Sequence, residues 1–80
     1  MHETHLIKPI ITGISQHARE ENATRVTKVH LKVGKLLGVN EDSFTETFKL
    51  LSQGTMLEKA ELEFTFFPGT IIQVLSFDVE

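Results

Sequence analysis

The sequence predicts an α+β domain in which two helices pack on one face of a three-stranded mixed sheet. Three observations lead to this prediction. Two segments carry apolar residues at helical spacing, three carry them at alternate positions, and the order is helix, strand, helix, strand, strand. Because each segment has a single apolar face, packing the helices against the sheet buries all of these faces together.

Length and composition indicate one ordinary globular domain over residues 1–80, with 40% hydrophobic and 24% charged residues. The chain has no cysteine, which excludes disulfides and thiolate zinc sites. A net charge of −3 argues against nucleic acid or an anionic membrane as a partner. No apolar run approaches the roughly 20 residues of a membrane span, and Lys8 and Pro9 interrupt any leader-like segment. We therefore expect a cytoplasmic protein.

The first helix is predicted over residues 4–21, where apolar residues recur at helical spacing. The stripe comprises Leu6, Ile10, Ile14 and His17, with Ile7, Ile11 and Ala18 beside it. Pro9 has no N–H to bond the carbonyl of His5, so the helix either begins late or is kinked there. Asn22 is suited to end the helix in a left-handed conformation.

The first strand begins at Arg25, where the apolar period changes to two. The residues expected on its buried face are Thr27, Val29, Leu31 and Val33, and those on the opposite face are Val26, Lys28, His30 and Lys32. Gly34 ends the strand, and a loop containing Gly38 follows.

The second helix has several candidate N-terminal caps, namely Asn40, Asp42 and Ser43. Ser43 and Glu46 also have the spacing of a capping box. The apolar stripe of this helix comprises Phe44, Phe48 and Leu51. Gly54 supplies its end.

Two further strands complete the predicted sheet. The apolar positions of the second strand are Leu62, Phe64 and Phe66, and those of the third are Leu75, Phe77 and Val79. The turn signal Pro68-Gly69-Thr70 predicts that these two strands pair as a hairpin. The first strand reaches the second through a helix, which favours parallel strands and hence a mixed sheet. The pattern leaves the strand order open.

The internal histidines offer no catalytic arrangement. His17 shares a helix face with Ile10 and Ile14, which favours a residue at the edge of the core over a metal ligand. His30 lies between Lys28 and Lys32 and is expected on a solvated face or a partner surface. No motif for nucleophilic, phosphate-binding or zinc-dependent catalysis is present, so we expect a binding protein rather than an enzyme.

The chain opens Met1-His2-Glu3-Thr4-His5, a pattern that can bind a metal. The α-amine of Met1, the backbone nitrogen of His2 and its imidazole can close adjacent chelate rings, and Glu3 could complete the fourth position. Planar, nitrogen-rich coordination suits Ni²⁺ or Cu²⁺ better than tetrahedral zinc. The alternative is a polar terminus without function, in which His5 is simply a residue of the first helical turn.

The sequence resembles the HypA/HybF family of nickel chaperones in [NiFe] hydrogenase maturation. The resemblance rests on Met1-His2-Glu3, HAREENA, RVTKVHLKVGKLLGV, SFTETFKLLSQGT and KAELEF, in that order. It implies that Met1, His2 and Glu3 bind Ni²⁺, and it implies two partners: a nickel-binding GTPase of the HypB type and the large subunit of a hydrogenase. It would make this chain a metallochaperone that acts through protein contacts.

Two departures from the family pattern stand out. Family members carry a zinc domain after the strand that matches residues 61–67, whereas Pro68-Gly69-Thr70 joins the two strands directly here. The resemblance therefore implies a nickel domain without a zinc site, whose folding does not require zinc. In addition, a loop acid that takes part in the nickel site of some members falls on Asn40. Glu41 or Asp42 could substitute for it, and Asn40 itself is better explained as a helix cap.

Two other functions stay open. The first is an adaptor that has kept the fold and lost the metal, working through an edge strand or an exposed sheet face. That face would comprise Lys28, His30, Lys32, Glu61 and Glu63. The second is a KH-like RNA-binding module, which the acidic charge and the missing GxxG loop disfavour. Pro9 beside the N-terminal segment also leaves open a homodimer formed by exchange of the first helix.

Overall fold

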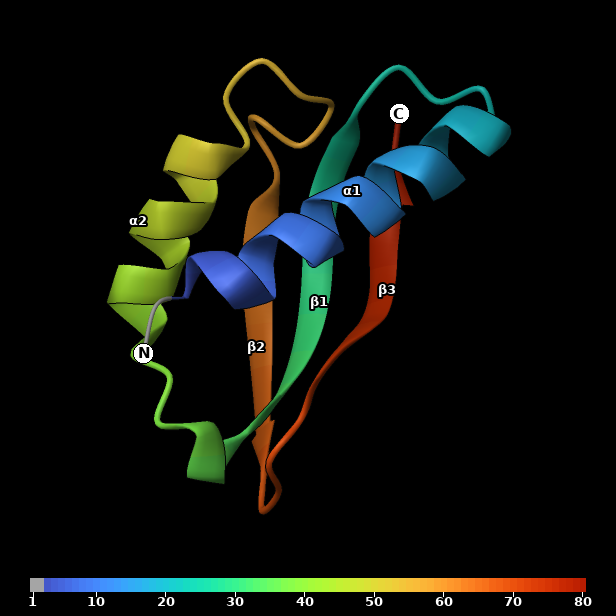
Figure 1. Ribbon diagram of the computed structural model, residues 1–80. Helices are drawn as coiled ribbons and strands as arrows, with labels where there is room; N and C mark the ends of the chain where they lie inside the picture. The colour runs from blue at the N-terminus through green and yellow to red at the C-terminus, as the bar shows by residue number, and fades with distance from the viewer. Residues whose placement is uncertain (1–2) are drawn as a thin grey trace.

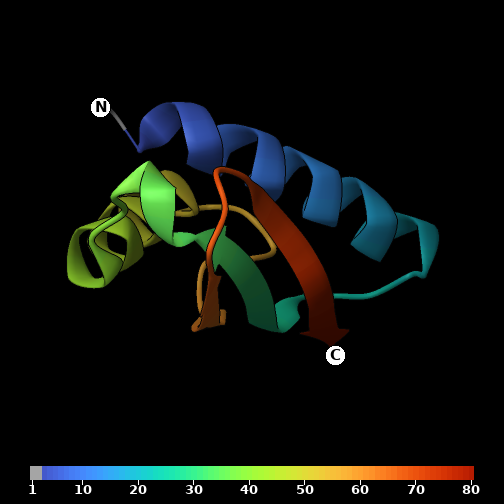
Figure 2. The ribbon, with the colours of Figure 1, turned by 90° about the horizontal axis from the view of Figure 1, so that it is seen from below.

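The computed structural model describes residues 3–80, so Met1 and His2 lie outside the described residues. Its elements are, in order, α1 (Thr4–Glu20), β1 (Val26–Gly34), the 3₁₀ turn η1 (Lys35–Leu37), α2 (Glu41–Leu51), β2 (Glu61–Phe67) and β3 (Ile72–Val79). In Figure 1, α1 crosses the sheet obliquely and α2 lies beside β2. Figure 2 shows α1 as a layer over the strands. The predicted α+β class and the order α-β-α-β-β are confirmed.

Helix α1 begins at Thr4 and continues through Pro9, so the late start allowed by the sequence is not observed. It ends where expected, because Asn22 has a positive φ of 59° just after the helix. The line of buried residues differs from the expected stripe. It comprises Ile7, Ile11, Ile14 and Ala18, whereas Leu6 and Ile10 are half-buried and His17 is exposed. Both lines have helical spacing, so only contact with the sheet decides between them.

The strand order is β2-β1-β3, so the predicted hairpin between the last two strands is wrong. Strand β1 pairs in parallel with β2, Val29 opposite Leu62, and antiparallel with β3, Val29 opposite Phe77. The mixed sheet is therefore confirmed. The physical reason for this order is burial. Among the three strands, the fully buried side chains all belong to β1, and a strand is buried best at the centre of a sheet.

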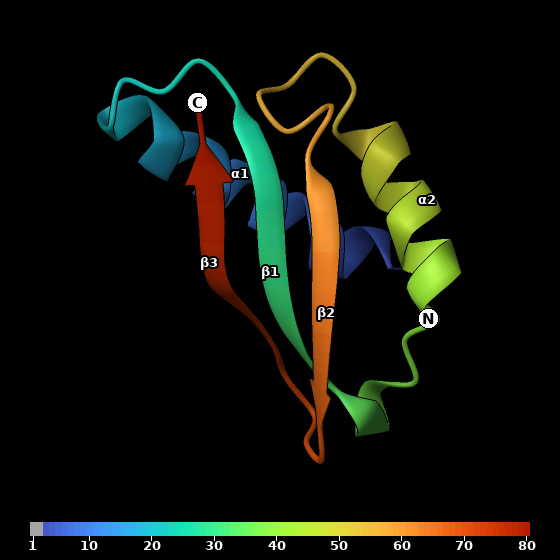
Figure 3. The same ribbon diagram turned by 180° about the vertical axis from the view of Figure 1, so that it is seen from behind.

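The chain passes from β2 to β3 across the end of β1 (Figures 1 and 3). Gly34 is the last residue of β1. The amide of Gly34 donates to the carbonyl of Ile71 at 2.8 Å, and the amide of Leu36 donates to the carbonyl of Gly69 at 3.0 Å. A Cβ atom at Gly34 would collide with the backbone of Gly69. The turn predicted at Pro68-Gly69 is present, but the strands it joins are separated by β1.

Two irregularities in the ladder between β1 and β3 shift side chains away from their expected faces. One lies between Val26 and Lys28, so Val26 is buried and Thr27 is not, the reverse of the prediction. The other leaves Leu75 between two paired residues of β3, and its side chain is 50% exposed. Each irregularity adds a residue to one strand, which flips the alternation beyond it.

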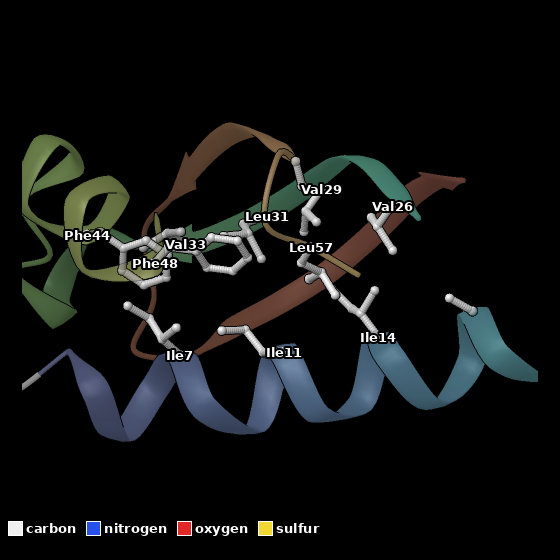
Figure 4. Packing of buried hydrophobic residues seen from close by; sticks show 12 residues of the cluster. Ile7, Ile11, Ile14, Val26, Val29, Leu31, Val33, Phe44, Phe48 and Leu57 are labelled. Atoms are coloured by element: carbon white, nitrogen blue, oxygen red, sulfur yellow. The ribbon is translucent and has the colours of Figure 1, made fainter. Parts of the chain in front are cut away.

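The core lies between α1, α2 and the sheet, and Figure 4 shows Ile7, Ile11 and Ile14 directed from successive turns of α1 into it. Helix α2 contributes Phe44 and Phe48, both fully buried as predicted. The other buried apolar residues are Ala18, Val26, Val29, Leu31, Val33, Leu57 and Ala60. The opposite face of the sheet is not covered by either helix (Figure 3).

Candidate functional site

Glu3 is the first described residue and forms the N-terminal cap position of α1. Its carbonyl accepts hydrogen bonds from the amides of Leu6 at 2.9 Å and Ile7 at 3.0 Å. Ile7 is fully buried in the core. The backbone of Glu3 is thus held at the start of α1, and the predicted ligands Met1 and His2, outside the described residues, are covalently attached to this position.

The side chain of Glu3 reaches the second helix. The hydroxyl of Ser43 donates a hydrogen bond of 2.8 Å to Oε1 of Glu3, across 40 positions of the sequence. Because Ser43 lies in the first turn of α2, the Glu3 carboxylate sits beside the N-terminus of that helix, where the helix dipole favours negative charge. One member of the predicted metal site is therefore held between the two helices.

Asn40 is the N-terminal cap of α2, as the sequence favoured. Its Oδ1 accepts a hydrogen bond of 2.9 Å from the amide of Ser43. Ser43 thus donates to Asn40 through its backbone amide and to Glu3 through its hydroxyl. Glu41 is the first residue of α2 and is exposed, and its carbonyl accepts from the hydroxyl of Thr45 at 2.9 Å. The predicted capping box of Ser43 and Glu46 is not the cap, because Asn40 takes that place.

Within residues 3–80, no three His, Cys, Asp or Glu side chains gather closely enough to hold a metal ion. His5 lies on the first turn of α1 and is exposed. A site at this end of the molecule would consequently depend on the Met1 amine and His2. The chemistry of that donor set fits Ni²⁺, since it combines amine, amide and imidazole nitrogens with a carboxylate oxygen.

The other two histidines lie away from Glu3. The side chain of His17 is 73% exposed and stands 3.8 Å from the carboxylate of Glu20. His30 lies on the uncovered face of the sheet, where its Nε2 is 2.9 Å from the hydroxyl of Thr65 and its Nδ1 is 3.9 Å from the carboxylate of Glu63. The expectation that His30 belongs to a solvated face is confirmed.

The uncovered sheet face carries paired charges. Lys28 Nζ lies 3.4 Å from the carboxylate of Glu63 on the neighbouring strand, and Lys32 Nζ lies 4.7 Å from the ring centroid of Phe67. The Lys28–Glu63 ion pair is exposed and contributes little to stability. The face has the composition expected for the adaptor alternative, and Glu63 is the acidic partner of both Lys28 and His30 on it.

A groove of about 630 Å³ between α1 and β3 was missed by sequence reasoning. Pro9 and Gly13 line it from the helix, and Val74 and Leu75 line it from the strand. A glycine inside a helical pattern, Gly13, is the sequence feature that could have indicated the groove. A Cβ there would meet no atom within 4 Å, so this part of the helix leaves space open. The groove shares no lining residue with the neighbourhood of Glu3, Asn40 and Ser43.

Neither helix among residues 3–80 has both the length and the hydropathy needed to cross a membrane.

Comparison with solved structures establishes the fold. The solution structure of the Ni metallochaperone HypA from Helicobacter pylori superposes with a TM-score of 0.83, covering 99% of this chain and 97% of that chain at 14% identity. A second solution structure of HypA protein also gives a TM-score of 0.83, at 15% identity, covering 100% of this chain and 97% of that one. At such identities the likeness shows a shared fold.

Comparison of sequences establishes the family. The hydrogenase maturation factor HypA of Legionella pneumophila (strain Lens) is 36% identical over 72 residues, 90% of this chain and 64% of the relative. That of Aquifex aeolicus is 42% identical over 62 residues, 78% of this chain and 54% of the relative. The chain thus spans between 54% and 64% of the length of these two relatives. Residues 1–72 match the family model described as hydrogenase/urease nickel incorporation, metallochaperone, hypA. The chain belongs to the HypA family of hydrogenase maturation and nickel incorporation proteins.

Proposed function

We propose that this protein binds Ni²⁺ through Met1, His2 and Glu3 and delivers it to a partner during [NiFe] hydrogenase maturation. The observation that carries the proposal is the position of Glu3, whose backbone begins α1 while its carboxylate is held by Ser43 of α2. Glu3, which directly follows the proposed ligands Met1 and His2, is thereby held against the folded domain. Membership of the HypA family supports nickel as the cargo.

The proposed chemistry is capture and release by ligand exchange. The Met1 amine, the backbone nitrogen of His2 and its imidazole would form the nitrogen plane, with a Glu3 carboxylate oxygen in the remaining position. Of these donors, the carboxylate would be the one that a partner's ligand displaces most readily. Ni²⁺ prefers nitrogen donors, and the carboxylate is the oxygen donor among nitrogens. Asn40 or Glu41 could supply a further oxygen from the start of α2.

The proposed partners are a nickel-binding GTPase of the HypB type and the hydrogenase large subunit. Matched relatives are named hydrogenase maturation factors, which supports transfer to a protein rather than catalysis. We place the transfer in the cytoplasm, where GTP is available to such a GTPase. Residues 68–71 join β2 to β3 directly. In other family members a zinc domain is inserted at this point, so we propose that the 80 residues act as one zinc-free unit.

One observation favours a second candidate function, protein contact without metal. Strand β3 is an edge of the sheet, and it exposes 50% of Leu75, which lines the α1 groove, and 40% of Val79. Exposed apolar residues on an edge strand are suited to pairing with a partner strand. In that case the protein would be an adaptor, and its N-terminus would bind no metal.

The deciding experiment is a Ni²⁺ titration by calorimetry and absorbance on protein with a native N-terminus. The His2→Ala variant should lose binding, while His5→Ala and His30→Ala serve as matched controls that keep it. One-to-one binding with a planar-nickel absorption band, lost only with His2, would support the proposal. No binding, or binding indifferent to His2, would reject it in favour of the adaptor.

A further inference from the structure

We infer that Ser43 is a positioning residue of the nickel site: its hydroxyl holds the Glu3 carboxylate in the orientation in which that carboxylate binds the metal. The inference rests on the proposed function and adds a residue from α2 to it. The contact that carries it is the 2.8 Å hydrogen bond from Ser43 Oγ to Glu3 Oε1.

The hydrogen bond joins side chains of the two helix N-termini, although the Ser43 side chain is exposed to water. The backbone of Ser43 is itself fixed, since its amide donates to Oδ1 of Asn40 at 2.9 Å. Glu3 is fixed in the same way from its own side, through the amides of Leu6 and Ile7. The N-terminus of α1 and the N-terminus of α2 are therefore joined by one hydrogen bond between side chains.

This contact restricts a side chain that would otherwise be flexible. A free glutamate loses rotamer freedom when it binds a metal, and a carboxylate that is already held loses less. The carboxylate has two oxygens, so Oε1 can accept from Ser43 while Oε2 binds the ion. Hydrogen-bond partners of this kind orient metal-binding side chains, and removing them commonly weakens metal affinity.

The test compares nickel affinity among variants of the full chain with a native N-terminus. Ser43→Ala removes the hydroxyl and should weaken Ni²⁺ binding roughly tenfold. Ser43→Thr keeps a hydroxyl and should restore most of the affinity. Thr27→Ala is the control, because it removes a hydroxyl that donates to the carbonyl of Asp78 and contacts none of the residues proposed for the nickel site. Thermal melts of all variants report whether α2 is intact.

A second comparison separates positioning from any general effect of the serine. In the Glu3→Ala background, Ser43→Ala should have no further effect on nickel affinity, because the side chain it orients is gone. An additional loss in that background would overturn the inference.

The two proposals fail differently. If wild type binds Ni²⁺ and His2→Ala abolishes binding, but Ser43→Ala binds like wild type, the role of Ser43 is rejected and the nickel site stands. If wild type itself does not bind Ni²⁺, both are rejected.

Discussion

Gly34 and Gly69 pack backbone against backbone, where the link from β2 to β3 crosses the end of β1. A Cβ on Gly34 would overlap the Gly69 carbonyl group and come within 2.8 Å of the amide nitrogen of Thr70. The amide of Gly34 also donates to Ile71 in the same link. The missing side chain is what lets the chain cross here and place β3 on the far side of β1.

Gly34→Ala should therefore destabilise the protein by about 1–3 kcal/mol, because the added methyl meets backbone atoms that cannot rotate away. Urea unfolding would measure the change. Gly13→Ala is the control: its Cβ meets nothing within 4 Å and lies inside α1, so it should gain roughly 0.5–1 kcal/mol. Equal effects of the two substitutions would show that the crossing does not depend on Gly34.

The same crossing explains why the sequence predicts the elements of this fold better than their order. Alternation in β1 and the helical spacing in α1 report local geometry, and both elements were predicted within a few residues. The signal at Pro68-Gly69 specifies a turn but not which strands it joins. That choice depends on β1 taking the central, most buried place, a property of the whole sheet.

Phe48→Ala should cost about 3–5 kcal/mol of unfolding free energy, because Phe48 is 1% exposed and a large cavity would remain between α2 and the sheet. Leu50→Ala on the same helix is the control, since Leu50 is 65% exposed and its loss should change stability by less than about 0.5 kcal/mol. Thermal or urea unfolding distinguishes them. A small cost at Phe48 would contradict the packing of α2 on the core.

Asn40→Ala should cost about 1 kcal/mol, because the amide of Ser43 loses the side-chain oxygen that caps α2. Asn40→Ser keeps a capping oxygen and should cost much less, so the pair of variants isolates the cap in thermal unfolding. Nickel affinity gives an independent reading of the same variants. If Asn40→Ser melts like wild type but binds Ni²⁺ more weakly, Asn40 is a metal ligand as well as a cap.

In the candidate site too, features set by neighbouring residues could be predicted from the sequence, whereas contacts between residues far apart in the sequence could not. The capping role of Asn40 was predictable because it depends on neighbouring residues, and it is confirmed. The donors proposed at Met1, His2 and Glu3 also follow from adjacent residues and stay a prediction. The sequence could not indicate that Ser43 bonds to Glu3, since the two are 40 positions apart and meet only when α1 packs beside α2. The groove beside β3 was missed for the same reason, because its two walls are far apart in sequence.

An extension of two residues before Met1 should abolish high-affinity nickel binding while leaving the melting temperature unchanged. The extension converts the α-amine into an amide, which removes one nitrogen donor and separates the others from the terminus. Stability should not change, because α1 begins at Thr4 and the described core begins at Ile7. The same two residues added after Glu80 provide the matched control. Calorimetric titration of both proteins gives the answer: if the N-terminally extended protein binds Ni²⁺ as tightly as the control, the amine of Met1 is not a ligand and the terminal chelate must be abandoned.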